Sequence, residues 1–260
     1  MVGRSGTLYV VATPLGNLGD LSPRAAELLR TVPVVAAEDT RVSRGLLAHL
    51  DAHPRLVAFH QHSDASRADA LIKILREGED IALVTDAGTP GVSDPGPFLV
   101  EGVRAAGFTV VPIPGPSAVT AAISVSGFPA DRYLFLGFAP RKGPERDRWL
   151  RQAATPGVTV VCFEAPNRVE ELLRELARLF PDIPLVEVPL DHPIYHIVYD
   201  LPRGTPKGHE HAGKPAPIPM PPASSPPNSS PPGAPSATWC AKWPTGRGWP
   251  AMSCMTSCTR

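Results

Sequence analysis

Polar and glycine-rich segments follow short apolar runs at five places in this chain of 260 residues. Carboxylates and histidines are the side chains that most often move protons in enzymes, and glycines let a backbone approach a ligand closely. Segment 86–96 combines three glycines with two prolines, which would fix the shape of a loop before a ligand binds. The five segments are 13–17, 38–41, 60–62, 86–96 and 164–168.

Several other kinds of site are excluded by motif and composition. The chain has neither Gly-x-x-x-x-Gly-Lys-Ser/Thr nor Gly-x-Gly-x-x-Gly, so neither an NTPase nor a dinucleotide enzyme is supported. Its four cysteines lack zinc-ligand spacing, and we expect no metal. Because 25 basic side chains balance 25 acidic ones, net charge gives no argument for nucleic-acid binding.

The elements that must position these segments form an α/β pattern. Apolar strands alternate with helices over the first half, which predicts a parallel sheet with ligands at the carboxyl ends of its strands. The expected strands are 7–12, 32–37, 56–59, 81–84, 108–112, 133–137, 159–163 and 185–188. The expected helices are one opened by Ser22-Pro23, one through 46–50, and 66–76, 98–106, 118–126 and 168–179, with a charged loop at 141–148.

The sequence predicts that the chain is divided into two folded domains and a tail. Pro and Gly at 113–116 indicate a hinge, so we expect α/β domains at 1–113 and 114–200. Residues 1–200 hold 24 acidic and 19 basic side chains, and hence a net charge of −5. Residues 201–260 hold 14 of the 33 prolines but one Leu, one Ile and neither Val nor Phe. Such a segment cannot bury enough apolar surface to order, and we predict a disordered tail.

An ordered series of motifs carries a resemblance to a known family. The motifs lie at 13–20, 37–41, 86–90, 93–96, 114–118, 126–129 and 163–168. Together they closely resemble the bacterial 16S ribosomal RNA cytidine 2′-O-methyltransferases of the tetrapyrrole-methylase superfamily, over roughly residues 6–188. Each motif alone is weak, but their order and spacing are specific.

The resemblance implies two α/β domains, S-adenosylmethionine bound between them, and a homodimer. It also implies 16S rRNA in the 30S subunit as partner, without DNA, since the 2′-hydroxyl distinguishes RNA. The residues implied for the cofactor site are Pro14, Asp86, Gly88, Thr89, Pro90, Val92, Ser117, Ala118, Phe163 and Pro166.

The candidates for the general base stand at predicted strand ends. They are Glu38, Asp39, Asp86 and His60. For each, a structural role remains open: Glu38 and Asp39 could cap a helix, Asp86 could shape the glycine loop, and His60 could be a surface residue. Glu164 could likewise pair with Arg168 one helical turn on.

Positive charge near these strand ends would hold the RNA backbone. The candidates are Arg41, Arg44, Arg141, Lys142, Arg146 and Arg168. The cluster at 141–148 is as readily a solvated loop face. Neither a signal peptide nor an apolar run long enough to span a membrane is present, so we expect a cytoplasmic protein without membrane contact.

The resemblance ends between about residues 188 and 203. A one-base shift of reading frame over 239–260 could encode an amphipathic helix, a turn and a second helix like the family's C-terminus, so a frameshift is one hypothesis. A tetrapyrrole C-methyltransferase and a catalytically dead, cofactor-binding remnant are the alternative functions.

Overall fold

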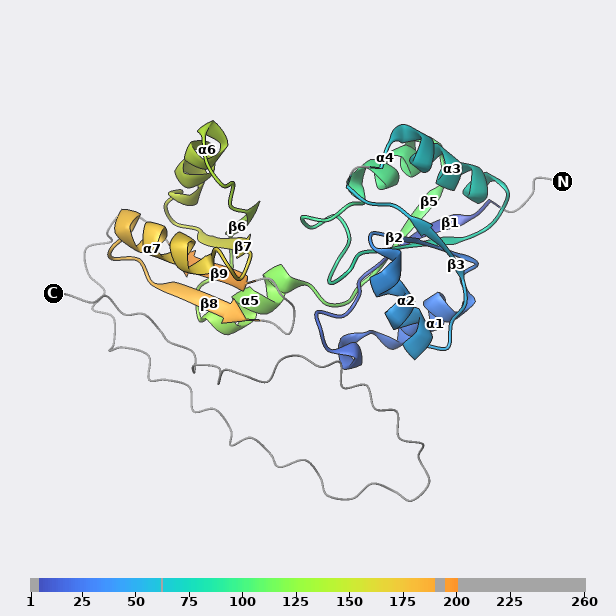
Figure 1. Ribbon diagram of the computed structural model, residues 1–260, viewed down its shortest axis with the longest axis horizontal. Helices are drawn as coiled ribbons and strands as arrows, with labels where there is room; N and C mark the ends of the chain where they lie inside the picture. Colours follow the sequence, from blue (N-terminus) through green and yellow to red (C-terminus); the bar gives the residue numbers. More distant parts are fainter. Residues whose placement is uncertain (1–4, 62, 190–194, 201–260) are drawn as a thin grey trace, which may run out of the picture. The chain divides into compact units, whose positions relative to one another are not determined.

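The computed structural model describes residues 5–61, 63–189 and 195–200. Its first sheet contains five parallel strands in the order β3-β2-β4-β1-β5 (Figure 1). The strands are β1 (Thr7–Val11), β2 (Val34–Ala37), β3 (Arg55–Ala58), β4 (Ile81–Val84) and β5 (Thr109–Ile113). The parallel α/β sheet expected from the sequence is therefore confirmed.

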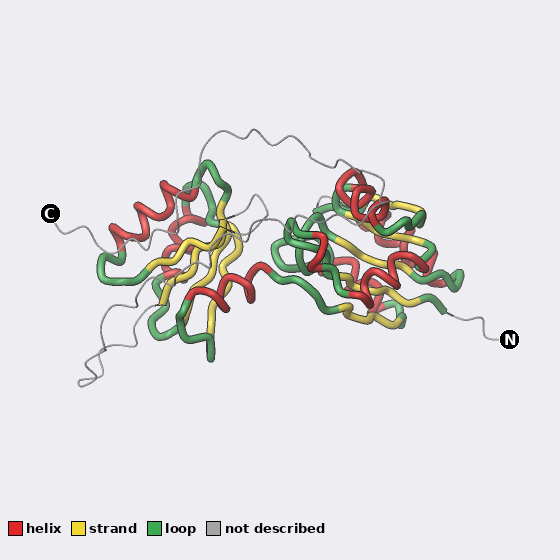
Figure 2. The backbone as a smooth tube through the Cα atoms, turned by 90° about the horizontal axis from the view of Figure 1, so that it is seen from below, coloured by secondary structure: helices red, strands yellow, loops and turns green. Residues whose placement is uncertain are grey.

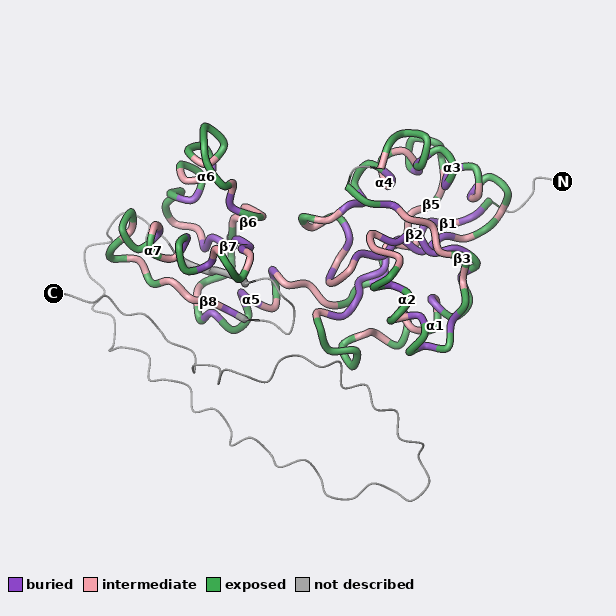
Figure 3. The backbone as a smooth tube through the Cα atoms, viewed as in Figure 1, coloured by how far each residue is buried: buried purple, intermediate pink, exposed green. Residues whose placement is uncertain are grey.

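Helices cover both faces of this sheet (Figure 2). α1 (Pro23–Thr31) and α2 (Thr40–His49) pack on one face, and α3 (Ala65–Arg76) and α4 (Pro97–Ala105) on the other. A short 3-10 helix, η1 (Leu18–Asp20), precedes α1. All four residues of β2 are buried because its side chains alternate between the two helical layers (Figure 3).

Local signals set where the helices begin. The Ser22 hydroxyl accepts a hydrogen bond from the Ala25 amide at 3.1 Å, and Pro23 occupies the first helical position of α1. The Asp39 and Asp64 carboxylates cap α2 and α3 in the same way. The expected starts of α1 and α3 agree with the structure to within a residue, whereas α2 begins at Thr40, ahead of the apolar positions 46–50 from which it was predicted.

The second sheet has the strand order β6-β7-β9-β8. β6 pairs with β7 in parallel, whereas β9 is antiparallel to both β7 and β8. The strands are β6 (Tyr133–Phe138), β7 (Thr159–Glu164), β8 (Leu185–Pro189) and β9 (Tyr195–Asp200), and the helices are α5 (Ala118–Ser126), α6 (Pro144–Ala153) and α7 (Val169–Leu179). α5 packs on one face of this sheet, and α6 and α7 pack on the other.

Two expectations for the second half were wrong or incomplete. The charged loop predicted at 141–148 is wrong, since most of it belongs to α6. Pro144 opens that helix, and Trp149 and Ala153, four residues apart, are its buried face. The charged side chains lie mainly on its exposed face, so charge concealed the helical period. β9 was not expected at all.

No helix within the described ranges is long and apolar enough to cross a membrane. The predicted disorder of 201–260 and the frameshift hypothesis concern residues outside those described. The domain boundary at 113–114 falls between β5 and α5 and stays a prediction.

Candidate functional site

The strand order creates a crevice at the carboxyl ends of β1 and β4. These strands are neighbours, but the helices that follow them, α1 and α4, cover opposite faces of the sheet. In open α/β sheets, this reversal leaves a gap outside the strand ends, and ligands bind there. The glycine-rich loop follows β4, so the sheet itself positions it beside this gap.

The start of this loop is fixed by the segment after β1. The Thr13 amide donates to the Gly88 carbonyl at 2.9 Å, and the Gly88 amide donates to the Thr13 carbonyl at 3.1 Å. The Thr13 hydroxyl donates to the Thr85 carbonyl at 3.0 Å. Gly88 has a φ of +82°, and a Cβ there would lie 3.2 Å from Leu15 Cδ2. Glycine is therefore required at this position.

A cavity of about 410 Å³ occupies the crevice, within the size range of small-molecule sites. It is lined by Leu15, Glu38, Asp86, Ala87, Gly88, Thr89, Val92, Ser93, Asp94, Ser117, Ala118, Phe138 and Phe163. The lining thus comes from both sheets. Apolar side chains and backbone form part of the wall, and the rest combines three carboxylates with the hydroxyl groups of Thr89, Ser93 and Ser117.

Most residues predicted for the cofactor site line this cavity. These are Asp86, Gly88, Thr89, Val92, Ser117, Ala118 and Phe163. Pro14, Pro90 and Pro166 are not among the lining residues; Pro14 and Pro90 are buried, and Pro166 is exposed. The Thr89 hydroxyl also donates to the Pro116 carbonyl at 2.9 Å, which ties the loop to the segment before α5.

Glu38 and Asp86 join the ends of β2 and β4. The Asp39 amide donates to Asp86 Oδ1 at 3.1 Å, and the Asp86 amide lies 3.5 Å from Glu38 Oε2. Burial, and next the negative charge of Asp86, raise the pKa of Glu38. These two carboxylates lie on the cavity wall and also hold neighbouring loops together.

Asp94 is a third acidic residue on the cavity wall, and it was missing from the candidates for the general base. Burial, followed by the charges of Glu38 and Asp86, raises its pKa to about 7, although the Thr85 hydroxyl acts in the opposite direction. The signal that could have found it was its place in the glycine-rich loop. Only the fold shows that it faces the two other carboxylates.

Two candidates for the general base do not line the cavity. The Asp39 carboxylate accepts from the Arg41 amide at 2.8 Å and pairs with the Arg41 guanidinium at 2.6 Å. This hydrogen bonding lowers the pKa of Asp39 to about 2, which makes it a weak base. His60 is exposed, and its amide donates to the Ser63 hydroxyl at 2.9 Å. The capping role left open for Asp39 is therefore present in the structure.

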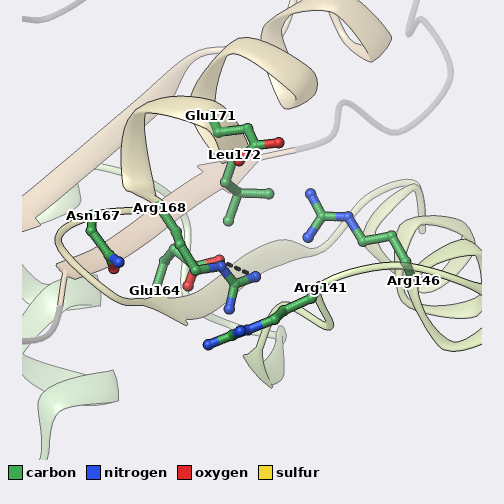
Figure 4. Close-up of a pocket in the computed structure, with 7 residues that line it drawn as sticks. All are labelled: Arg141, Arg146, Glu164, Asn167, Arg168, Glu171 and Leu172. Atoms are coloured by element: carbon green, nitrogen blue, oxygen red, sulfur yellow. Dashed lines mark ion pairs between the residues drawn. The ribbon is translucent and has the colours of Figure 1, made fainter.

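A second, polar pocket of about 290 Å³ lies at the end of β7 (Figure 4). It is lined by Arg141, Arg146, Glu164, Asn167, Arg168, Glu171 and Leu172. Phe163 and Glu164 are consecutive in β7, so their side chains take opposite faces of the sheet. Phe163 lines the first cavity, whereas Glu164 lines this pocket.

Two of the arginines in this pocket have structural partners. Arg168 lies 3.1 Å from Glu164 Oε2 and donates to the Ala139 carbonyl at 2.8 Å, so the pairing left open for Glu164 is present. Arg146 pairs with Glu175 and lies 5.6 Å from the centre of the Trp149 ring. Among the described residues, Arg141 has no such ion pair.

The other basic candidates lie on the surface. Arg44 and Lys142 are exposed and line neither pocket. Arg41 is exposed too, and its guanidinium is occupied by Asp39. The structure therefore brings together only the three arginines of the second pocket, and Arg141 is the one whose guanidinium has no carboxylate partner within the described ranges.

This fold and cavity define a member of a methylase family. A family model described as Tetrapyrrole (Corrin/Porphyrin) Methylases matches residues 7–188, well over half of the chain. The chain belongs to this family, and the resemblance drawn from its motifs is confirmed. A second model, for a domain of unknown function, matches residues 157–232.

Relatives within the family carry a more particular name, Ribosomal RNA small subunit methyltransferase I. The relative from Xylella fastidiosa is 51% identical over 175 residues, which cover 67% of this chain and 64% of that protein. The Pseudomonas aeruginosa relative is 46% identical, with 68% and 62% covered, and the Escherichia coli O157:H7 relative is 43% identical, with 66% and 60% covered. The match thus spans less than two thirds of each relative.

A solved structure supports the fold. Uroporphyrin-III-C-methyltransferase from Thermus thermophilus superposes with a TM-score of 0.52 at 22% sequence identity, covering 75% of this chain and 92% of that one. At this identity, the likeness shows a shared fold and does not extend to the substrate.

Proposed function

We propose that this chain transfers a methyl group from S-adenosylmethionine to the 2′-oxygen of a cytidine in 16S rRNA within the small ribosomal subunit. The observation that carries the proposal is the cavity at the β1–β4 crevice, whose walls combine acidic, hydroxyl and aromatic groups. The names of the relatives favour rRNA over a tetrapyrrole as the substrate.

The cavity residues fit S-adenosylmethionine in charge and shape. Phe138, Phe163 and Val92 offer apolar surface for an adenine ring. Glu38 and Asp86 offer negative charge and hydrogen-bond acceptors for ribose hydroxyls or for the positive groups of the cofactor. The bound cofactor would supply a methyl group activated by a positively charged sulfur.

The residues of this chain would bind and orient the reactants. The Thr13–Gly88 hydrogen bonds hold the loop in advance, which reduces the entropy lost when a ligand binds. In-line methyl transfer requires the reacting atoms to be aligned about 3–3.5 Å apart. A carboxylate on the cavity wall would take the proton of the hydroxyl group, as general bases do.

We further propose that Arg141 contacts the RNA backbone. Its guanidinium has no carboxylate partner among the described residues, so binding a phosphate would break no existing ion pair. A 30S substrate would place the protein in the cytoplasm. We keep the homodimer and the domain boundary at 113–114 as parts of this proposal, to be tested by light scattering and by expression of residues 1–113.

Two measurements test the proposed function in sequence. Calorimetric titration of the full chain with S-adenosylmethionine should show micromolar binding. Tritium from labelled cofactor should then enter unmodified 30S subunits but not subunits whose target cytidine carries a 2′-O-methyl group. Binding without transfer to 30S subunits would reject the rRNA proposal. It would favour the catalytically dead, cofactor-binding remnant, whereas absence of binding would reject both the proposed function and that remnant.

A further inference from the structure

The three carboxylates on the cavity wall are restrained to different degrees. Asp86 accepts a main-chain hydrogen bond from Asp39, and Glu38 lies within reach of the Asp86 amide. Both therefore tie loops together. Among the described residues, Asp94 makes no such connection between loops, and the nearby Thr85 hydroxyl only lowers its pKa slightly against the larger effect of burial. Asp94 is thus the carboxylate whose protonation would disturb the loop connections least.

The backbone around Asp94 is held in place on both sides. Ser93 has a φ of +65°, in the left-handed region that a side chain other than glycine rarely adopts. Gly96 has a φ of +147°, and a Cβ there would lie 3.3 Å from Leu83 Cδ2. These two backbone conformations define the turn that carries Asp94 to the cavity wall, where its carboxyl is available to a substrate.

The elements around the cavity place two charged groups near Asp94. Glu38 comes from the end of β2 and Asp86 from the end of β4, whereas the second sheet contributes the apolar rings of Phe138 and Phe163. Two further groups lie outside the cavity lining. The charge of His60 lowers the pKa of Glu38, and the charge of Arg41 interacts favourably with that of Asp86. Burial and the two carboxylates raise the pKa of Asp94 to about 7, near the value that suits a general base at neutral pH.

We propose that Asp94 is the catalytic base, the group that accepts the proton of the ribose 2′-hydroxyl. This inference rests on the proposed function. The ribose oxygen forms a bond to the methyl carbon, the methyl–sulfur bond breaks with its electron pair left on sulfur, and the hydroxyl proton passes to the Asp94 carboxylate. Asp94 then releases that proton to water, so the enzyme is unchanged.

The kinetic test compares Asp94→Asn with Asp69→Asn, which removes an exposed carboxylate from α3. Single-turnover methylation of 30S subunits should slow by about 10²–10⁴-fold in Asp94→Asn, and by less than twofold in the control. For the unsubstituted chain, the rate should rise about tenfold per pH unit below pH 7 and level off above it. Asp94→Asn should lose that dependence, and Asp94→Glu should keep it at a lower rate.

Two readouts do not depend on activity. Asp94→Asn should bind S-adenosylmethionine within tenfold of the unsubstituted chain. Its urea midpoint should exceed that of the unsubstituted chain at pH 8 and match it at pH 4. A raised carboxyl pKa means that the folded state binds more protons than the unfolded state between about pH 4 and 7, so stability falls as pH rises through that window.

The possible results separate the two proposals. An Asp94→Asn chain that methylates at more than a tenth of the normal rate, or that keeps the pH dependence, would overturn the role of Asp94 while the proposed function stands. An unsubstituted chain that binds the cofactor yet leaves 30S subunits unmethylated would overturn both.

Discussion

At the scale of single residues, Glu164 shows how burial changes the value of an ion pair. Its side chain is 1% exposed, whereas that of its partner Arg168 is 25% exposed. Its Oε1 atom also accepts from the Ala165 amide at 2.8 Å. A carboxylate this buried needs its cation, because losing the partner leaves an uncompensated charge.

Arg168→Met should therefore lower the free energy of unfolding by about 3 kcal/mol. Adding Glu164→Gln should restore much of the loss, because it removes the stranded charge. Urea denaturation measures all three chains. Arg174→Met is the matched control, since Arg174 and Glu170 form an exposed pair that should contribute about 0–0.5 kcal/mol. Equal losses at both pairs would contradict this explanation.

A second prediction at this scale concerns Arg141. Arg141→Ala should reduce the slope of log affinity against log salt for 30S binding by about 0.7–1, as expected for the loss of one phosphate contact. Arg174→Ala should leave the slope unchanged. Filter binding from low to moderate salt measures both. An unchanged slope in Arg141→Ala would remove this residue from the RNA interface.

At the scale of elements, two glycines near the first sheet differ in whether the surrounding structure leaves room for a Cβ atom. Gly45 lies in the middle of α2 with nothing within 4 Å of where a Cβ would be. Gly6 lies just before β1, where a Cβ would stand 2.0 Å from the Glu79 carbonyl oxygen. The first glycine costs helical stability without a steric reason, and the second makes a close backbone approach possible.

Gly45→Ala should raise the free energy of unfolding by about 0.5–1 kcal/mol. Gly6→Ala should lower it by about 2 kcal/mol, because the backbone of β1 or of the segment before β4 must shift. Urea unfolding of the two single variants measures both values. Destabilisation by Gly45→Ala would mean that α2 is not helical at that position.

At the scale of the whole described molecule, the Thr89–Pro116 hydrogen bond joins the loop after β4 to the segment that leads into α5. Thr89→Val keeps the shape of the side chain but loses this bond. A net hydrogen bond is worth about 1 kcal/mol, so affinity for S-adenosylmethionine should fall about fivefold in calorimetry. Thr89→Ser keeps the hydroxyl and should bind within twofold. A similar loss in both variants would mean that the methyl group matters instead.

The sequence by itself determined the first sheet, its helices and most of the cavity lining. Short apolar runs bounded by turn residues, such as 81–84, are typical of buried parallel strands, and Ser22-Pro23 is a local signal that depends on no distant contact. The loop at 86–96 was found for the same reason, since glycine and proline constrain the backbone wherever they occur. By contrast, the helical period of α6 was concealed by its charges, and β9 was not recognised.

Only the tertiary structure decided which polar residues meet. Asp39 and Asp94 are both acidic and both follow a buried strand, yet one caps a helix and the other lines the cavity. The difference comes from the strand order, which brings the ends of β2 and β4 together. It also comes from burial, which raises the pKa of Asp94 while Arg41 lowers that of Asp39. The strand order and the burial of Asp94 depend on residues distant in sequence that are close only once the chain has folded, whereas the Asp39–Arg41 pair is local.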